Sequence, residues 1–310
     1  MCNSKIRMIS VVIPLYNKED SILRTVHCLK LQTMTQFEVI IVDDGSTDKS
    51  FAHAEEAING DTRFKLIYKS NGGVSSARNE GIRNAKYEYI SFLDADDYWV
   101  ETYLEELVKM IQTYPDAGIY GVGWNFMFNN TIENNLVSAK SEYLIVDNMW
   151  DTPPSYFTST TTTTAVLRAV GMFNENVSIG EDVDLWYRIL LRYKGVYLKK
   201  VLAYYVQDSE NRLYLKHVPI ERNWVNYLDQ YKSDRMANMS FRCHIDKLMV
   251  AELFKYLDSE EYKVNTELRT RVKYLMNQLD FHVLPLKMRL RLRMPWLFRL
   301  KKTIVNVLKK

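Results

Sequence analysis

Three short apolar runs, each followed by a polar loop and then by a helical pattern, most constrain how this chain can fold. The runs cover Ile9 to Pro14, Phe37 to Val42 and Phe64 to Tyr68. Apolar residues recur at helical spacing after the first run, and a helix is expected over about 49–58 after the second. Such alternation predicts an α/β fold with a mostly parallel sheet, flanked by helices, whose ligands bind beyond the carboxyl ends of the strands.

The stretch YISFLDADDYWV, residues 89–100, places an apolar strand directly before Asp94, Asp96 and Asp97. Carboxylates this close repel one another and cost folding free energy unless a cation or several donors offset their charge. The alternative for an isolated cluster is a solvated turn, in which Asp97 caps a helix beginning near Trp99. The question is therefore whether other acids join this cluster.

Two further acidic pairs lie at the ends of predicted elements, one at the end of a strand and one at the start of a helix. Asp43 and Asp44 end the second strand, and Glu181 and Asp182 open an amphipathic helix. Convergence of these acids on one sheet edge calls for a cation. Hard oxygen ligands favour Mg²⁺ or Mn²⁺, which use one or two carboxylates and fill other positions with phosphate oxygens. A diphosphate ligand is therefore expected.

Sequence signatures of the commonest phosphate-binding folds are absent. The chain has no GxxxxGK[ST] loop and no GxGxxG after the first strand, which disfavours P-loop enzymes and dinucleotide-binding proteins. NGGVSSARNEG, residues 71–81, instead offers two glycines, then serines and Arg78 at the start of a helix. The free N–H groups of a helix start favour an anion.

Five segments in order carry a resemblance to a known family: VVIPLYNKE (11–19), VIIVDDGSTD (39–48), NGGVSSARNEG (71–81), FLDADD (92–97) and GEDVDLWYR (180–188). Together they resemble the inverting family 2 glycosyltransferases with a GT-A fold. The resemblance spans roughly residues 8–205. It implies a GT-A domain over 1–215, and the apolar periodicity beyond it indicates a helical extension over 216–310.

The resemblance implies roles at the matching positions. The loop from Pro14 to Tyr16 would wrap the nucleotide base, and Asp43 or Asp44 would hydrogen-bond the base. Arg78 would approach the nucleotide, Asp94 the ribose or donor sugar, and Asp96 the metal that bridges the diphosphate. The donor-binding set is then Pro14, Tyr16, Asp43, Asp44, Arg78, Asp94 and Ala95, with Asp96 as the metal ligand.

The GED segment would supply the catalytic base. Inverting transfer needs a carboxylate that removes the acceptor hydroxyl's proton, and Asp182 matches that position. Glu181 would orient the acceptor or the base. The alternative is that both are acids favoured by the helix dipole at a helix start. Trp186, one turn further, either stacks on a sugar ring or fills the core.

The expected activity is metal-dependent, inverting glycosyl transfer of the hexosyltransferase type. The donor would be a nucleoside-diphosphate sugar, with uridine the base that the resemblance favours. The acceptor would be a saccharide or lipid-linked saccharide in surface polysaccharide synthesis. The alternatives are a catalytically silent sugar-nucleotide-binding or membrane scaffold protein, and a nucleotidyltransferase. Many family members place a basic residue after the GED helix; here Arg212 and His217 are the candidates.

Composition and charge bound the location and partners. Three cysteines without CxxC spacing, and no apolar run long enough for a membrane span, favour a cytoplasmic protein with free thiols. The net charge of +3 conceals a tail, 281–310, with nine Lys and Arg and no acid. A basic amphipathic segment over 285–310 indicates peripheral attachment to the anionic inner face of the plasma membrane; a solvated charged face is the alternative. No nucleic-acid partner is expected.

Overall fold

The computed structural model describes residues 8–128, 131–132, 143–146, 160–211, 218–280, 286 and 289–290. It divides into two compact units, Met1–Trp224 and Val225–Lys310, which are described separately. The predicted domain boundary at 215 lies outside the described residues, as do Arg212 and His217. The basic segment 285–310 also lies outside them, apart from residues 286, 289 and 290.

The first unit is built on a ten-stranded sheet with the path β3-β2-β1-β4-β9-β6-β10-β5, to which β7 and β8 add at β6 and β10. The strand pairs β1/β2, β1/β4, β2/β3 and β6/β10 are parallel. The mostly parallel sheet predicted from the sequence is therefore confirmed. The strands are β1 (Ile9–Leu15), β2 (Phe37–Asp43), β3 (Phe64–Tyr68), β4 (Tyr89–Phe92), β5 (Tyr98–Trp99), β6 (Ile119–Phe128), β7 (Thr131–Ile132), β8 (Tyr143–Val146), β9 (Thr160–Thr163) and β10 (Gly195–Val206).

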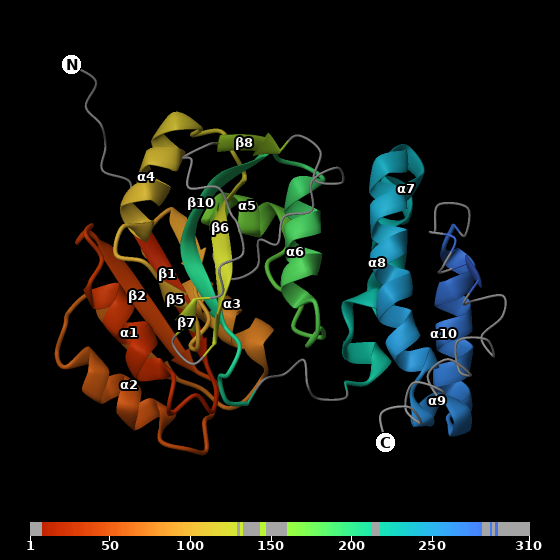
Figure 1. Ribbon diagram of the computed structural model, residues 1–310, viewed down its shortest axis with the longest axis horizontal. Helices are drawn as coiled ribbons and strands as arrows, with labels where there is room; N and C mark the ends of the chain where they lie inside the picture. The colour runs from red at the N-terminus through yellow and green to blue at the C-terminus, as the bar shows by residue number, and fades with distance from the viewer. Residues whose placement is uncertain are drawn as a thin grey trace. The chain divides into compact units, whose positions relative to one another are not determined.

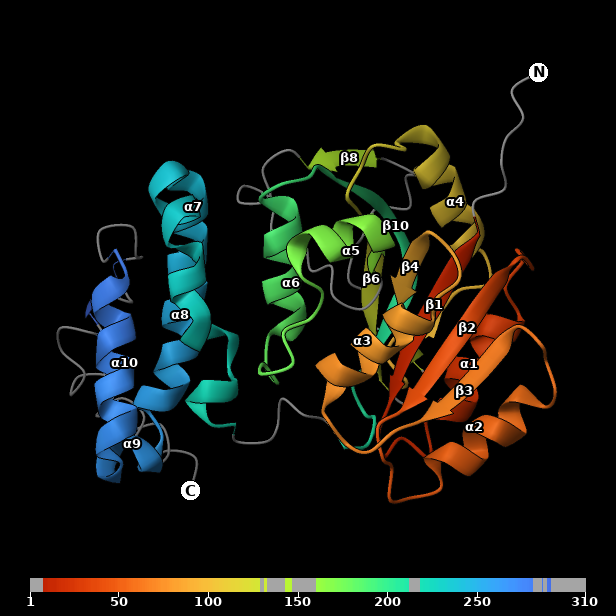
Figure 2. The same cartoon turned by 180° about the vertical axis from the view of Figure 1, so that it is seen from behind.

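Helices cover both faces of this sheet (Figures 1 and 2). Alternate residues of β1, including Val11 and Ile13, belong to the buried cluster shared with α1, α2 and α4, because successive strand side chains point to opposite faces. Val12 points the other way and packs closely on Gly81 of α3. The helices are α1 (Ile22–Lys30), α2 (Ser50–Ile58), α3 (Val74–Asn84), α4 (Tyr103–Thr113), α5 (Thr164–Val170) and α6 (Glu181–Leu190).

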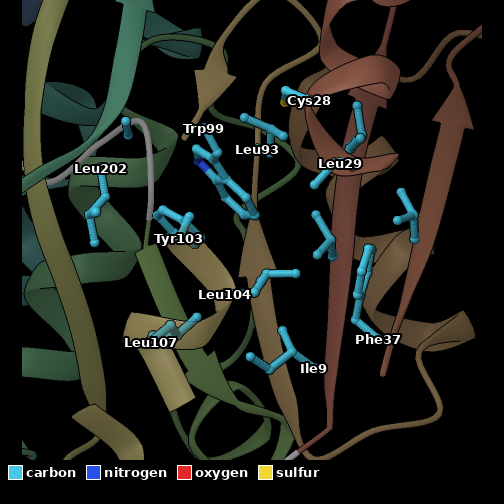
Figure 3. Packing of buried hydrophobic residues seen from close by; sticks show 14 of the residues in the cluster. Ile9, Cys28, Leu29, Phe37, Leu93, Trp99, Tyr103, Leu104, Leu107 and Leu202 are labelled. Atoms are coloured by element: carbon cyan, nitrogen blue, oxygen red, sulfur yellow. The ribbon is translucent and has the colours of Figure 1, made fainter. Parts of the chain in front are cut away.

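Buried residues fix the acidic loop 94–97 at both of its ends. Leu93 and Trp99 are fully buried, and Figure 3 shows both in the core beside α1. The Trp99 ring stacks on Tyr103 with centroids 3.7 Å apart. The predicted helix start near Trp99 is wrong: Trp99 belongs to β5 and pairs with Ala203 of β10, and α4 begins at Tyr103.

The threonine-rich stretch 158–168 is only partly a strand. Thr160–Thr163 form β9, which lies between β4 and β6 and is antiparallel to both. The chain then turns into α5, whose first turn is capped by the Thr163 hydroxyl, which accepts a hydrogen bond from the Val166 N–H. The capping hydroxyl explains why a β-branched run ends in a helix.

The second unit is helical in its described part. It contains α7 (Lys232–Ala237), α8 (Met239–Leu257), α9 (Glu260–Val264) and α10 (Thr266–Gln278) after the 3₁₀ segments η2 (Ile220–Arg222) and η3 (Trp224–Tyr231), which lie at the junction of the units. A buried pair joins Arg235 to Asp246, with Nε to Oδ1 at 2.8 Å and Nη2 to Oδ2 at 2.9 Å. No helix among the described residues is both long and apolar enough to cross a bilayer.

Candidate active site at the carboxyl edge of the sheet

Parallel strands bring the loops named in the sequence to one edge. β1, β2 and β4 run in the same direction, and β6 follows β4's direction because both are antiparallel to β9. β10 is parallel to β6, so the residues after Val206 emerge at that edge too. Ligands of such sheets bind beyond the carboxyl ends of the strands.

Helix α1 holds the acidic loop by its backbone. The Thr25 hydroxyl contacts the carbonyl oxygens of Ala95 and Asp97 at 2.9 and 3.0 Å, and Arg24 Nη2 donates to the Asp96 carbonyl at 3.0 Å. Asp97 is buried and accepts the Val206 N–H at 3.2 Å. Burial and the neighbouring Asp96 charge raise the pKa of Asp97 well above its ordinary value. Asp97 is thus an interior tether between the acidic loop and β10.

Arg78 of α3 joins the acidic loop to the GED segment. Its Nη2 lies 2.7 Å from Asp94 Oδ1 and its Nη1 lies 2.8 Å from Glu181 Oε1. The Arg78 side chain is 7% exposed, and its guanidinium lies 5.2 Å from the centroid of the Phe173 ring. Burial lowers the pKa of Arg78, but the carboxylates of Asp94 and Glu181 outweigh burial and raise it.

Asp182 opens α6 beside this bridge. Gly180 precedes the helix at φ +74°, and a Cβ there would overlap the Trp224 ring, so the turn requires glycine. The half-buried Asp182 accepts the Val183 N–H at 2.7 Å. Burial and the adjacent Glu181 charge raise the pKa of Asp182 to about 7, although Arg78 acts in the opposite direction. A carboxylate with a pKa near 7 is suited to accept a proton at neutral pH.

The two acids that follow one another at the end of β2 have different surroundings. Asp44 accepts hydrogen bonds from Lys69 Nζ at 2.6 Å and from the N–H groups of Gly72 and Gly73 at 2.9 and 2.7 Å. Asp43 is fully buried, and no described residue donates to its Oδ2. Burial raises the pKa of Asp43, and the Ser46 N–H, which donates to Oδ1, lowers it. Asp44 therefore anchors the 71–73 loop, and Asp43 keeps one acceptor oxygen without a donor among the described residues.

Lys18 is a site residue that the motif analysis missed. Its Nζ lies 2.6 Å from Asp96 Oδ2, and the Ser209 hydroxyl donates to the same oxygen at 2.6 Å. Lys18 Nζ also donates to the Glu210 carbonyl. The only signal in the sequence was the position of Lys18 two residues after Tyr16, in the loop that the resemblance assigned to the base.

Residues 209–211 lie across the start of α1. The Glu210 carboxylate accepts hydrogen bonds from the N–H groups of Asp20 and Ser21 at 3.2 and 3.1 Å, and from the Ser21 hydroxyl at 2.6 Å. Asn211 Nδ2 donates to the Tyr16 carbonyl at 3.1 Å, and the Tyr16 residue is 37% exposed. We call this piece the 209–211 segment. Half-buried Pro14 lies in β1, two residues before Tyr16.

Several acids in this site already have cationic partners from the chain itself. Arg78 offsets Asp94 and Glu181, and Lys18 offsets Asp96. Over the described part of the chain, no group of three or more His, Cys, Asp or Glu side chains is arranged to hold a metal ion. The donor chemistry nevertheless fits Mg²⁺ or Mn²⁺, since one or two carboxylates suffice when phosphate oxygens complete the shell. Among the described residues, the hydrogen bonds to the Asp96 carboxylate all use Oδ2, which leaves Oδ1 for a cation.

Trp186 belongs to the core. It is 2% exposed and packs against Phe92 and Phe173, with ring centroids 6.0 and 6.1 Å away. Of the two alternatives drawn from the sequence, the core position is therefore the correct one. These rings form the apolar wall behind Arg78.

Known glycosyltransferases are similar to this chain in sequence. Residues 10–162 match the family model described as Glycosyl transferase family 2. The chain is 39% identical over 104 residues to the glycosyltransferase EpsJ of Bacillus subtilis, covering 34% of this chain and 30% of EpsJ. It is 29% identical over 249 residues to the glycosyltransferase GlyA of Streptococcus pneumoniae, covering 75% of this chain and 35% of GlyA. It thus matches well under half the length of either relative.

Solved structures confirm the fold. TarS of S. aureus in complex with UDP-GlcNAc has a TM-score of 0.59 at 19% identity, covering 87% of this chain and 72% of TarS 1–349. The same protein in complex with UDP has a TM-score of 0.57 at 18% identity, with 93% and 92% of the two chains covered. The predicted GT-A fold is therefore confirmed. With its family model matched and its fold shared, the chain belongs to glycosyl transferase family 2.

Proposed function

We propose that this chain is an inverting glycosyltransferase that moves a sugar from a nucleoside-diphosphate sugar to an acceptor hydroxyl, with Asp182 as the catalytic base. The observation that carries the proposal is the Arg78 bridge. It holds the acidic loop, through Asp94, beside the first turn of α6, where Asp182 lies. An acid loop for the donor and a carboxylate of raised pKa for the acceptor thus meet at one sheet edge.

The chemistry is a single displacement. The acceptor oxygen attacks the anomeric carbon on the face opposite the diphosphate, and Asp182 takes the hydroxyl proton. The bond between the anomeric carbon and the diphosphate oxygen breaks, and the nucleoside diphosphate leaves with the electron pair. Glu181 is committed to Arg78, so it orients the first turn of α6 around the base.

The donor would lie along the carboxyl ends of β1, β2 and β4. The exposed Tyr16 ring, next to Pro14, offers a face for a base, and Asp43 Oδ2 offers an acceptor for a base N–H. Asp94, with one oxygen on Arg78, and the buried Ala95 would line the ribose or donor sugar. Uridine is the favoured base, supported by the shared fold with a protein solved with UDP-GlcNAc. A hexose is the proposed sugar.

Asp96 would hold the divalent ion. When bound, Mg²⁺ or Mn²⁺ would neutralise charge that develops on the leaving diphosphate. Lys18 Nζ, 2.6 Å from Asp96 Oδ2, is the chain's own cation at the same place. Ion binding therefore has to displace Lys18 or share Asp96 with it.

The acceptor proposal rests on the sequence alone. A saccharide or lipid-linked saccharide in surface polysaccharide synthesis would suit a chain whose basic segment 285–310 contacts anionic lipid from the cytoplasmic side. Liposome co-sedimentation of the full chain, compared with a chain that ends at residue 284, tests this contact. Pelleting that depends on phosphatidylglycerol and is lost on truncation would support it, and equal pelleting of both chains would contradict it.

The activity is tested with purified full-length chain, UDP-GlcNAc and MnCl₂, by measuring UDP release with saccharide acceptors. Asp182→Asn should lower turnover by about 10²- to 10⁴-fold and leave UDP affinity unchanged, since base catalysis is lost while donor contacts remain. Asp116→Asn, at an exposed position, is the matched control. Excess EDTA should stop the reaction.

The products also separate the rival functions. Pyrophosphate release would indicate a nucleotidyltransferase, and UDP binding without any turnover would indicate a silent binding protein. Wild-type turnover in Asp182→Asn would remove Asp182 from its role.

A further inference from the structure

We propose that Arg78 is a positioning residue: it holds the catalytic helix α6 against the donor-side acidic loop and does not contact the nucleotide. The proposal rests on the proposed function, because it assigns the bridge a role in that reaction. It departs from the role that the family resemblance implied for this arginine.

The guanidinium is already committed to protein carboxylates. Nη1 and Nη2 lie 2.8 and 2.7 Å from Glu181 and Asp94, and Arg78 is 6% exposed. These two pairs use two of the five guanidinium N–H groups, and Nε has no partner among the described residues but is itself buried, so a diphosphate would have to reach a side chain that the protein almost covers. Leaving Glu181 charged and buried without its cation would be costly, because a buried ion that loses its partner is strongly destabilising.

The Arg78 bridge is one of several contacts that the same face of α3 makes with residues 173–181. Ser75, Arg78 and Asn79 are three and four residues apart, so they project from one side of the helix. The Ser75 hydroxyl donates to the Val177 carbonyl at 3.1 Å. Asn79 makes two hydrogen bonds to the Phe173 backbone, at 2.9 and 3.0 Å. This face of α3 therefore holds residues 173–181, the connection that leads into α6.

Electrostatics give the bridge a consequence for chemistry. Burial and the charges of Glu181 and Asp94 raise the pKa of Asp182, and Arg78 lowers it; Tyr187 is the further titratable group that interacts with Asp182. Without Arg78, the adjacent carboxylates of Glu181 and Asp182 would lose the cation that lowers the pKa of Asp182. The first turn of α6 would then loosen, and Asp182 would hold its proton to higher pH.

Kinetics with UDP-GlcNAc and MnCl₂ separate positioning from donor binding. Arg78→Met should lower kcat by about 10²-fold, because small displacements of a base are that costly, while the Kd for UDP stays within about threefold. Its kcat/KM profile should show an acid limb at higher pH than wild type. Arg78→Lys should recover only part of kcat, since an ammonium cannot fork to two carboxylates. Arg168→Met, at an exposed position of α5, should behave as wild type.

Two further measurements keep the proposal testable if Arg78→Met is unstable or the enzyme is inactive. Glu181→Gln removes one carboxylate, and combining it with Arg78→Met should cost little more than Arg78→Met alone, since each change breaks the Arg78–Glu181 contact. Carboxyl ¹³C NMR of Asp182 needs no turnover, and its titration should move to higher pH in Arg78→Met. A raised Kd for UDP with kcat retained, or an unmoved Asp182 titration, would overturn the proposal. If the wild-type chain shows no turnover, that result would instead count against the proposed function.

Discussion

Two cation–carboxylate networks lie at the same sheet edge, and they differ in what the cation contacts and which elements it joins. Arg78 is buried between Asp94 and Glu181 and packs on the Phe173 ring. Lys18 is only part-buried, and it meets Asp96 together with the 209–211 segment. The first network joins two helices, α3 and α6, to the acidic loop after β4; the second joins loops only.

The difference indicates which ion pairs hold the structure together and which a bound ligand or ion could replace. Arg78 forks to two carboxylates, so its loss would leave the buried Glu181 carboxylate unpaired. Lys18 pairs with one carboxylate, Asp96, which also accepts the Ser209 hydroxyl, so a bound ion could replace this ammonium at the loss of a single charge pair. The Lys18 network lies where the diphosphate and its ion are proposed to bind, so exchange there suits the reaction.

Breaking the buried network should have the largest effect on stability. Arg78→Met should lower the free energy of unfolding by about 3–5 kcal/mol, because it leaves the Glu181 carboxylate buried and unpaired. Lys18→Met should cost less, because Asp96 keeps the Ser209 hydroxyl as a donor. Urea unfolding followed by tryptophan fluorescence measures both changes. Equal losses in the two variants would erase the proposed distinction between the networks.

The pH dependence of kcat/KM measures the pKa of Asp182, beside the buried network, without changing any residue. With the pKa of Asp182 raised to about 7, the base is protonated below that pH and ionised above it. The value of kcat/KM should therefore rise with pH and level off above 7, falling about tenfold per unit on the acid side. An acid limb near pH 4 in the free enzyme would show that the pKa of the catalytic base is not raised.

The affinity for Mn²⁺ tests the network formed by Lys18 and Asp96. Lys18→Met removes the ammonium from Asp96, so the affinity for Mn²⁺ alone should rise by about fivefold, equivalent to roughly 1 kcal/mol. Calorimetric titration with MnCl₂ measures the change, with exposed Lys49→Met as the control. Unchanged or weaker Mn²⁺ binding in Lys18→Met would argue that the ion does not bind at Asp96.

The smallest effect is expected at the 209–211 segment. Glu210→Gln removes a negative charge from the start of α1 and should cost about 0.3–1 kcal/mol. Amide hydrogen exchange over 207–211 should quicken, because the segment loses its strongest contacts with Asp20 and Ser21. Glu55→Gln, on an exposed face of α2, serves as the control. Unaltered exchange in Glu210→Gln would mean that the segment is held by Ser209 and Asn211 instead.

Much of the fold was predictable from local pattern, and the exceptions have local causes. The strand predicted over Phe64 to Tyr68 matches β3, and the one over Phe37 to Val42 is extended by one residue. Trp99 was misassigned because a two-residue strand has no periodicity of its own; its pairing with Ala203 defines it. The β-branched run from Thr160 favours a strand throughout, yet the cap formed by the Thr163 hydroxyl starts a helix at Thr164.

The sequence by itself determined the α/β alternation and hence the sheet edge at which Asp43, Asp94 and Asp96 gather, because hydrophobic periodicity is a local property repeated along the chain. Only the tertiary structure decided which charges pair. Lys18 meets Asp96, and Arg78 meets Glu181, across 78 and 103 residues of sequence. Ion pairing depends on distances through space, and no periodic pattern in a single chain encodes those distances.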